Sequence, residues 1–284
     1  MAKILTGKEV AASINEESKK VIERLAREGI VPCIGIIRIG ENESDISYEK
    51  GLLKRCEAMR LNVKKYMLPS DVSEERVIRT IEEANEDENV HGILIFRPLP
   101  KHIREDVVLA HLKPEKDVDC VTLASLAGVF TGRKIGFLPC TPEAVIRTLD
   151  HYGVDCKGKK AVVIGRSIVV GKPLAMLLLG KNATVTMCHT KTADLPKEAK
   201  EADILIAAAG KAGIVTGDFV KEGQIVIDVG INVNEDGKLC GDVDRESVEP
   251  AAEAITPVPG GIGSVTTAVL VSHVVSAASE QYGM

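Results

Sequence analysis

The stretch KAVVIGRSIVVG, residues 160–171, combines a short apolar run with a turn bounded by two glycines. The run Lys160–Ile164 predicts a buried strand, and the following residues Gly171–Gly180 predict a helix. A glycine turn that leads from a strand into a helix lets a phosphate approach the free N–H groups of the helix N-terminus. The spacing fits neither G-x-G-x-x-G nor a P-loop, because the glycines stand one residue too far apart and Pro173 replaces the magnesium-binding Ser or Thr. The turn alone therefore predicts an α/β unit, and such turns are structural about as often as functional.

The chain on both sides of this stretch alternates between strand-like and helix-like segments. Strands separated by helices indicate parallel pairing through right-handed crossovers, so the expected fold class is α/β. Ser73 is well placed to cap one of the helices. Further strands are expected at 31–39, 63–68, 92–96, 184–188, 204–208 and 225–229, and further helices at 8–28, 46–60, 73–86, 195–201 and 265–282.

The length of 284 residues predicts two domains, at about 150 residues per domain. The segment Thr131–Pro142 is the candidate crossing between them. We expect one domain at residues 1–138 and the other at residues 139–264. The final helix, residues 265–284, follows the second sheet and is expected to pack back on the first domain.

Composition narrows the class of protein. Lys and Arg number 36 against 41 Asp and Glu, and this net charge of −5 argues against nucleic-acid binding. The first residues reach charge too early for a signal peptide, and no apolar run approaches the ~18 residues of a membrane span. The seven cysteines are scattered without C-x-x-C, so no metal site is expected. We expect a soluble cytoplasmic protein with reduced thiols and no membrane partner.

The end of the next predicted strand bears on the kind of dinucleotide that the turn could bind. An NAD site usually carries an Asp or Glu there, which bonds the ribose hydroxyl. The segment Cys188–Thr192 has no acid, and the first one follows at Asp194. Arg166, Thr190 and Lys191 are suited to a phosphate instead, although a lone lysine is more often only a solvated surface charge. The combination favours NADP over NAD.

Two loops contain more than a turn requires. The segment Ile255–Gly263 places two prolines and three glycines before the final helix, which suggests a rigid backbone against which a flat ligand lies. In Lys116–Asp119, two carboxylates stand at i and i+2. An isolated D-x-D is most often solvated, but its position ahead of the domain crossing predicts a place near a cleft.

Five segments carry a more specific signal when they are taken together and in order. They are Pro139–Pro142, Gly165–Ser167 with Val170–Pro173, Val226–Asn232, Gly241–Val243 and Thr256–Gly263. With them the chain resembles the bifunctional methylenetetrahydrofolate dehydrogenase/cyclohydrolase family over almost its whole length. The resemblance implies two α/β domains around a cleft, joined by long helices, and a homodimer. The first domain would bind tetrahydrofolate derivatives, and the second would be Rossmann-like and bind NADP.

The resemblance implies roles in the cofactor site for the residues that match the family pattern. Gly165, Arg166 and Ser167 would hold the cofactor phosphates. Thr190 would lie in the region of the 2′-phosphate, and Ile231 on the nicotinamide side.

In the substrate site, the resemblance implies that Asp119 bonds the pterin ring. A carboxylate suits that role because it accepts two parallel hydrogen bonds from an aminopyrimidine edge. Tyr48 would lie beside the folate, and the backbone of Pro259, Gly260 and Gly261 would line the substrate.

Two positions of the substrate site depart from the family pattern. The family motif Tyr-x-x-x-Lys places Leu52 at the lysine that is tied to cyclohydrolase proton transfer. The motif Val-Gln-Leu-Pro-Leu-Pro places Phe96 at the glutamine that bonds this lysine. Hydride transfer mainly needs orientation, whereas hydrolysis needs acid–base work that Leu and Phe cannot do. The sequence therefore predicts an NADP-dependent methylenetetrahydrofolate dehydrogenase with little or no cyclohydrolase activity.

Alternatives to this function stay open. One is the complete bifunctional enzyme, with Lys50, Lys54 or Arg97 displaced into the site by a local register shift. Another is a non-catalytic folate- and NADP-binding protein, although such a protein would not need the intact cofactor loop. A 2-hydroxy-acid dehydrogenase is less well supported, because none of the six histidines belongs to a partnered His–acid motif.

Overall fold

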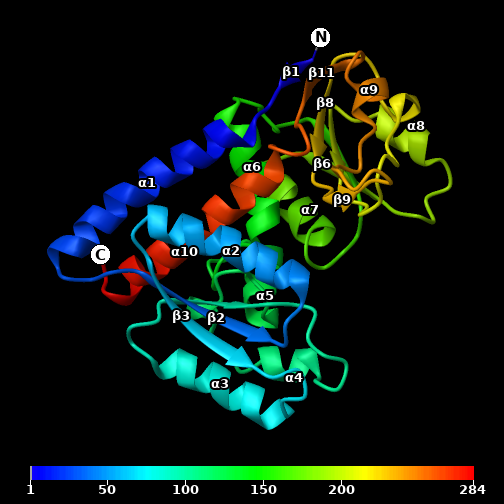
Figure 1. The fold of residues 1–284 in the computed structure, drawn as a ribbon. Coiled ribbons are helices and arrows are strands. Elements are labelled where there is room, and N and C mark those ends of the chain that lie inside the picture. The colour runs from blue at the N-terminus through cyan, green and yellow to red at the C-terminus, as the bar shows by residue number, and fades with distance from the viewer. Residues whose placement is uncertain (1) are drawn as a thin grey trace. The chain divides into compact units, whose positions relative to one another are not determined.

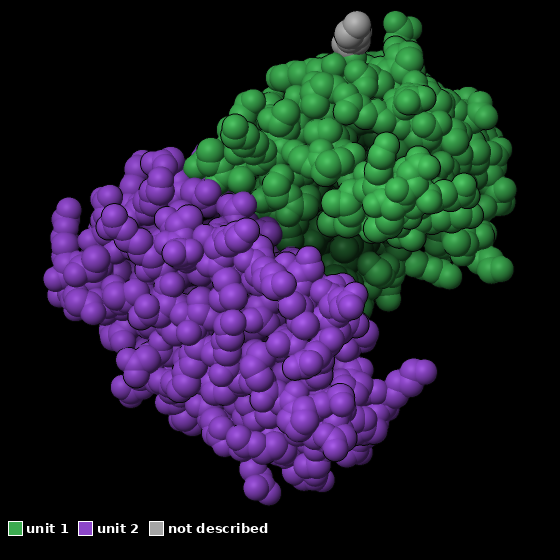
Figure 2. All heavy atoms as spheres, viewed as in Figure 1, with its two compact units in different colours: residues 1–12, 141–266 green, residues 13–140, 267–284 purple. Residues whose placement is uncertain are grey.

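The computed structural model describes residues 2–284, and the chain divides into two compact units (Figures 1 and 2). Unit 1 contains the chain up to Ala12 together with Thr141–Thr266, and unit 2 contains Ser13–Cys140 together with Thr267–Met284. The chain passes from one unit to the other within helices α1 (Gly7–Arg27), α6 (Cys140–His151) and α10 (Ile262–Gln281). Each unit is α/β, and helices join them.

Unit 1 is built on a six-stranded sheet in which every neighbouring pair is parallel, in the order β1-β11-β8-β7-β5-β6. The chain leaves β5 for β6 on one side and then continues to β7 on the other, which makes the sheet doubly wound. The strands are β1 (Lys3–Ile4), β5 (Lys160–Ile164), β6 (Thr184–Cys188), β7 (Ile204–Ala207), β8 (Gln224–Asp228) and β11 (Ala252–Ile255). The other elements are α7 (Gly171–Gly180), α8 (Leu195–Lys200), α9 (Arg245–Val248), a 3₁₀ turn (Gly217–Phe219) and the hairpin of β9 (Asn232–Val233) with β10 (Leu239–Cys240).

The N-terminal strand differs from the expected division, which placed residues 1–138 in the other domain. Lys3 and Ile4 form β1, which pairs in parallel with β11 at the edge of the unit 1 sheet. The Leu5 N–H extends this pairing to the Ile255 carbonyl at 2.9 Å. A strand of two residues is too short to show a periodic pattern, so the sequence did not indicate it.

Unit 2 contains a three-stranded parallel sheet in the order β3-β2-β4. Figure 1 shows α3 and α4 on one side of this sheet and α2 and α10 on the other. Ser73 caps α3 as predicted, since its hydroxyl accepts a hydrogen bond from the Arg76 N–H at 3.3 Å. The elements are β2 (Cys33–Ile39), β3 (Asn62–Leu68), β4 (Gly92–Ile95), α2 (Glu43–Ala58), α3 (Glu74–Glu86), α4 (Glu105–Leu109), a 3₁₀ turn (Pro114–Lys116) and α5 (Leu123–Thr131).

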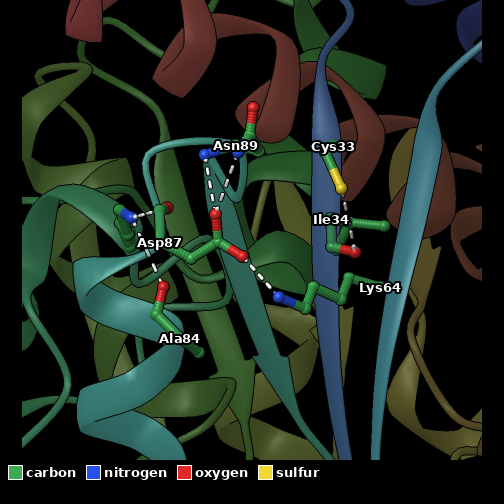
Figure 3. A network of polar contacts seen from close by, with 7 residues as sticks. Cys33, Ile34, Lys64, Ala84, Asp87 and Asn89 are labelled. Carbon is green, nitrogen blue, oxygen red and sulfur yellow. Dashed lines mark hydrogen bonds and ion pairs between the residues drawn. The ribbon is translucent and has the colours of Figure 1, made fainter.

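The first residue of the K-D-x-D segment closes the end of α3. Lys116 is buried, and its ammonium donates to the carbonyl oxygens of Asp87 at 2.8 Å and Ala84 at 3.4 Å. A cation stabilises the free carbonyls at a helix C-terminus. Figure 3 shows the side chain of Asp87 between Lys64 and Asn89, at 2.5 Å from the Lys64 ammonium and 2.9 Å from the Asn89 N–H. The contacts of Lys116 hold the segment that contains Asp117 and Asp119 against the end of α3.

The first aspartate of the segment is structural. Asp117 is fully buried, and its carboxylate accepts hydrogen bonds from the N–H groups of Val121 and Thr122, both at 2.9 Å. It also accepts the hydroxyl of Ser125 at 2.7 Å. The Asp117 carboxylate already accepts these three hydrogen bonds at the start of α5. Asp119 is therefore the carboxylate of this pair that is available for a ligand.

Helix α10 bears on the expectation that no segment of the chain spans a membrane. It is long and apolar enough to cross a membrane by length and composition, with a mean hydropathy of 1.5 over an 18-residue window. Of that window, 67% is buried in the structure. A core helix of a soluble protein has the same length and composition, so this single helix is weak support for a membrane span.

Replacing Asp117 with Ala tests its structural role. The change removes the acceptor of two N–H groups and one hydroxyl, and each buried group left unpaired costs ~1–3 kcal/mol, so we expect the free energy of unfolding to fall by about 3 kcal/mol. Urea unfolding followed by circular dichroism measures it. Asp71→Ala, at an exposed aspartate of the same unit, is the control and should change stability by less than ~0.5 kcal/mol. Similar small changes in both variants would contradict the assignment.

Candidate functional site

The turn after β5 packs its backbone directly against the end of β7. Gly165 has a φ of +139°, and a Cβ at this position would lie 2.1 Å from the carbonyl oxygen of Ala208. A Cβ on Gly171 would lie 2.2 Å from the Gly165 carbonyl oxygen. Both positions therefore need glycine. They bring the turn to the point between β5 and β7 where the strand order reverses, and doubly wound sheets bind ligands at such points.

Ser167 orders the start of α7. Its Oγ accepts hydrogen bonds from the N–H groups of Val170 at 3.0 Å and Gly171 at 3.4 Å. The sequence predicted free N–H groups at this helix start, and the serine side chain accepts hydrogen bonds from two of them. Its own hydroxyl proton can still be donated, and the neighbouring Arg166 side chain is exposed. The turn therefore presents a hydroxyl and a guanidinium to solvent.

The turn after β6 lies beside the turn after β5. The two strands pair in parallel to their last residues, and the Gly165 N–H donates to the Cys188 carbonyl at 2.9 Å. The β6 turn is closed by a 2.9 Å hydrogen bond from the His189 N–H to Thr192 Oγ1. Thr190 is exposed within this closed turn. The structure thus brings the candidate 2′-phosphate residue to the candidate phosphate loop.

Ile231 lies against the first turn of α10. Its side chain is 66% exposed, and a Cβ on Gly263 would lie 3.2 Å from Ile231 Cδ1. The loop before this turn is tied to the N-terminal segment, because the Gly7 N–H donates to the Gly260 carbonyl at 2.8 Å. Unit 1 therefore places the candidate nicotinamide residue at the helix start that directly follows the segment Pro259–Gly261.

Two buried aspartates, for which the sequence predicted no individual role, organise the loops after β7 and β8. Asp242 accepts three backbone N–H groups of Ala209–Lys211 at 2.6–2.9 Å and the side-chain amide of Asn232 at 2.9 Å. Asp228 accepts three further backbone N–H groups at 2.9–3.0 Å. Burial raises the pKa of the Asp228 carboxyl to about 6, although these N–H groups oppose the shift. The sequence signal that could have marked Asp228 and Asp242 is the pair of motifs that contain them, Val226–Asn232 and Gly241–Val243.

In unit 2, α2 presents Tyr48 and Leu52 on one face, as their i, i+4 spacing predicts. Leu52 is 1% exposed, whereas Tyr48 is 42% exposed. The ring of Phe96, which follows β4, lies 5.8 Å from the Tyr48 ring at an interplanar angle of 81°. Edge-to-face pairs of this kind are favourable apolar contacts. The positions that the family pattern fills with lysine and glutamine are therefore apolar in this chain.

The hydroxyl of Tyr48 lies in a polar environment. The side chains of Thr267 in α10, Asp119 and Arg55 lie within electrostatic reach of it. Burial, and after it the charge of Asp119, raise the pKa of the Tyr48 hydroxyl well above its ordinary value. Tyr48 therefore stays protonated at neutral pH and can donate or accept a hydrogen bond.

Several groups surround the Asp119 carboxylate, and they pull its pKa in opposite directions. Burial is the largest cause and raises the pKa, and the negative charge of Asp117 adds to it. Interactions with the nearby Cys140, His273 and Arg97 side chains lower it. The net pKa of Asp119 is raised, so its ionised form depends on these three partners.

The cations considered for a register shift stay outside the apolar pair. Helix α2 runs without interruption from Glu43 to Ala58, and Lys50 and Lys54 are exposed on it. Arg97 forms an ion pair with Glu105, with its Nε 2.8 Å from Oε1. The local register shift is therefore absent from α2.

Among residues 2–284, no group of three or more His, Cys, Asp or Glu side chains is arranged to hold a metal ion.

The predicted residues fall into two sets, and the structure adds others to the second. Unit 1 holds Gly165, Arg166, Ser167, Thr190, Ile231, Pro259, Gly260 and Gly261; unit 2 holds Tyr48, Leu52, Phe96 and Asp119, with Arg55, Arg97, Cys140, Thr267 and His273 as the additions.

Comparisons with known proteins cover both units. Residues 5–119 match the catalytic domain of tetrahydrofolate dehydrogenase/cyclohydrolase, and residues 139–282 match the NAD(P)-binding domain of the same family. The bifunctional protein FolD of Clostridioides difficile is 52% identical over 278 residues, which cover 98% of this chain and 97% of that protein.

Solved structures agree with these matches. The bifunctional FolD enzyme of Campylobacter jejuni has a TM-score of 0.96 at 41% identity and covers 99% of both chains. The Trypanosoma brucei enzyme, solved with NADP and an inhibitor, has a TM-score of 0.93 at 33% identity and covers 100% of this chain and 99% of that one. The chain belongs to the tetrahydrofolate dehydrogenase/cyclohydrolase family.

Proposed function

We propose that this protein oxidises 5,10-methylenetetrahydrofolate to the methenyl form, with NADP as the hydride acceptor. Family membership over the full chain supports the substrate class, and one relative was solved with NADP. The observation that carries the proposal is the paired turns after β5 and β6, which present Arg166, Ser167 and Thr190 together. NADPH formation from methylenetetrahydrofolate tests it. No reduction of either NADP or NAD would overturn the dehydrogenase proposal.

The chain's own residues would act mainly by binding and orienting. The bound nicotinamide supplies the site that accepts the hydride. Asp119, as a carboxylate, would accept two hydrogen bonds from the aminopyrimidine edge of the pterin. The loop Pro259–Gly261 and Ile231 would offer a rigid surface for a flat ring. No side-chain acid is needed for this step, because the folate nitrogens stabilise the positive charge that forms.

Arg166 is expected to select NADP over NAD. A guanidinium binds a phosphate through charge-assisted hydrogen bonds worth ~1.5–3 kcal/mol, so Arg166→Ala should raise the KM for NADP by about tenfold or more and that for NAD by less than about twofold. Initial rates with each cofactor measure this. Lys157→Ala, which removes another exposed cation of unit 1, is the control and should leave both constants unchanged. An equal rise for both cofactors would contradict the 2′-phosphate role.

Asp119 is expected to anchor the folate and not the cofactor. Removal of one partner of a buried charged hydrogen bond costs ~2–5 kcal/mol, so Asp119→Ala should weaken folate binding by about thirtyfold or more. Titration calorimetry with a folate and separately with NADP measures both affinities. NADP binding should change by less than about twofold, since Asp119 lies outside the cofactor set of unit 1. Unchanged folate binding would show that the pterin is bound elsewhere.

Hydrolysis of the methenyl product is the second candidate activity. The comparisons favour it, because close relatives are named as bifunctional proteins, and they favour the complete enzyme over its loss. The local residues oppose it, because Leu52 is buried and Phe96 packs against Tyr48. On the strength of these two positions we propose that the hydrolytic step is slow in this chain.

Simultaneous measurement of NADPH and of the methenyl absorbance separates the two activities. We expect the methenyl product to accumulate in step with NADPH. Because general acid–base assistance is worth ~10²–10⁴ in rate, Leu52→Lys with Phe96→Gln should accelerate hydrolysis by at least about tenfold. Phe96→Leu is the apolar control. If the unaltered protein releases formyltetrahydrofolate as fast as NADPH, the complete bifunctional enzyme is correct.

The remaining expectations from the resemblance concern assembly and location. We propose a homodimer, supported by the family resemblance. We also propose that it lies in the cytoplasm, because the cysteines of residues 2–284 are scattered and form no disulfide with one another. Light scattering of the purified protein tests the mass, and a monomer would contradict the assembly.

A further inference from the structure

A histidine that no sequence motif marked lies buried in the middle of α10. His273 is 5% exposed and has buried apolar neighbours on its helix, among them Val271 and Val274. A buried imidazole needs hydrogen-bond partners. Its Nδ1 lies 2.8 Å from the carbonyl oxygen of Val118, and since a carbonyl only accepts, Nδ1 carries the proton. Phe137 covers the ring at 5.0 Å between centroids. His273 is thus held in one orientation.

The carbonyl that His273 binds belongs to the residue immediately before Asp119. The same oxygen also accepts the thiol of Cys140 at 3.3 Å, and the sulfur lies 3.7 Å from His273 Nδ1. The Val118 side chain is packed so closely that a Cβ on Gly92 would lie 2.4 Å from it. One side of the Asp119 backbone is therefore fixed by two donors and by close packing.

The other side of Asp119 is fixed by an unusual backbone conformation. Cys120 has a φ of +56°, in the left-handed region that non-glycine residues seldom adopt. Its N–H closes a turn onto the Asp117 carbonyl at 3.4 Å. Residues held in this region persist where the surrounding structure determines them, and they cluster at functional sites. The turn leaves the Asp119 side chain little freedom of direction.

His273 is also one of the side chains around the Asp119 carboxylate. Asp117 lies on its own turn, Tyr48 on α2, Arg97 after β4, Cys140 at the start of α6 and His273 on α10. Arg97 is already engaged with Glu105, and Asp117 repels the carboxylate. The turn that carries Asp119 is therefore held on both sides, and His273 supplies one of the donors.

We infer that His273 is a positioning residue for folate binding: through its hydrogen bond to the Val118 carbonyl, it fixes the turn that carries Asp119. The inference rests on the proposed role of Asp119 in binding the pterin. Without this donor, the Val118 carbonyl would keep only the Cys140 thiol, and the direction of the Asp119 side chain would be less well defined. Loss of the hydrogen bond should therefore weaken folate binding and leave the affinity for NADP unchanged, because the proposed cofactor residues lie in unit 1.

The variants His273→Leu and His273→Asn separate the hydrogen bond from the filling of space. Leucine removes the donor, whereas the asparagine Nδ2 stands at the same bond distance along the side chain as the histidine Nδ1 and can still donate to Val118. Titration calorimetry with 5-formyltetrahydrofolate gives the folate affinity. We expect His273→Leu to bind the folate about three- to tenfold more weakly, and His273→Asn to bind it within about twofold of the unaltered protein. Equal folate affinity in all three proteins, or an asparagine variant as weak as the leucine variant, would overturn the inference.

A further variant keeps the inference testable if His273→Leu fails to fold. His273→Gln keeps a side-chain amide but moves the donor one bond further from the backbone, so it should bind the folate more weakly than His273→Asn, and equal affinities would overturn the inference. NADP affinity is the control and should be the same in all of these proteins. Failure of the proposed function looks different, because the unaltered protein would then bind no folate, or would bind it equally well after Asp119→Asn.

Discussion

Backbone N–H groups in the loops beside the sheets need acceptors, and in this protein buried carboxylates provide them. Asp117, Asp228 and Asp242 are at most 3% exposed, and each accepts at least two backbone N–H groups. A buried N–H without an acceptor costs ~1–3 kcal/mol, so a loop with two or three of them has one favourable conformation while its aspartate is present. The loops that carry the candidate ligand-binding residues therefore depend on side chains that touch no ligand.

The substitution of a polar pair by an apolar one is compatible with this framework. If Leu52 alone replaced a lysine, a glutamine would remain near Tyr48 without its partner, and an unpaired buried amide is costly. With Phe96 as well, both polar partners are absent, and the two side chains pack against their neighbours. Loss of both members of a hydrogen-bonded pair can be nearly neutral for stability. The double substitution is therefore compatible with a stable fold, and what it changes is the chemistry of the site.

Local patterns in the sequence predicted most of the regular elements. The apolar runs at Lys160–Ile164 and Thr184–Cys188 became β5 and β6, and Ser73 became the cap of α3, because those signals lie within a few residues. The strand at Lys3–Ile4 was missed, since it exists only through pairing with β11. His273 was missed for a similar reason, because its partners lie 133 and 155 residues away in the chain. Contacts of that kind have no signature in the spacing of residues.

The two aspartates of the D-x-D segment show how neighbouring residues of one type acquire different tasks. Both are screened from solvent to a large degree, and the donors around them decide what each can do. Three donors from the chain surround Asp117, so its carboxylate is already satisfied. The Asp119 carboxylate has the Cys140 thiol and charged groups beside it, and it keeps acceptor capacity for another molecule. Because Asp117 also helps to hold the turn, the structural aspartate is part of the scaffold of the available one. The two aspartates therefore act together: the Asp117 carboxylate orders the backbone, and the Asp119 carboxylate can face a ligand.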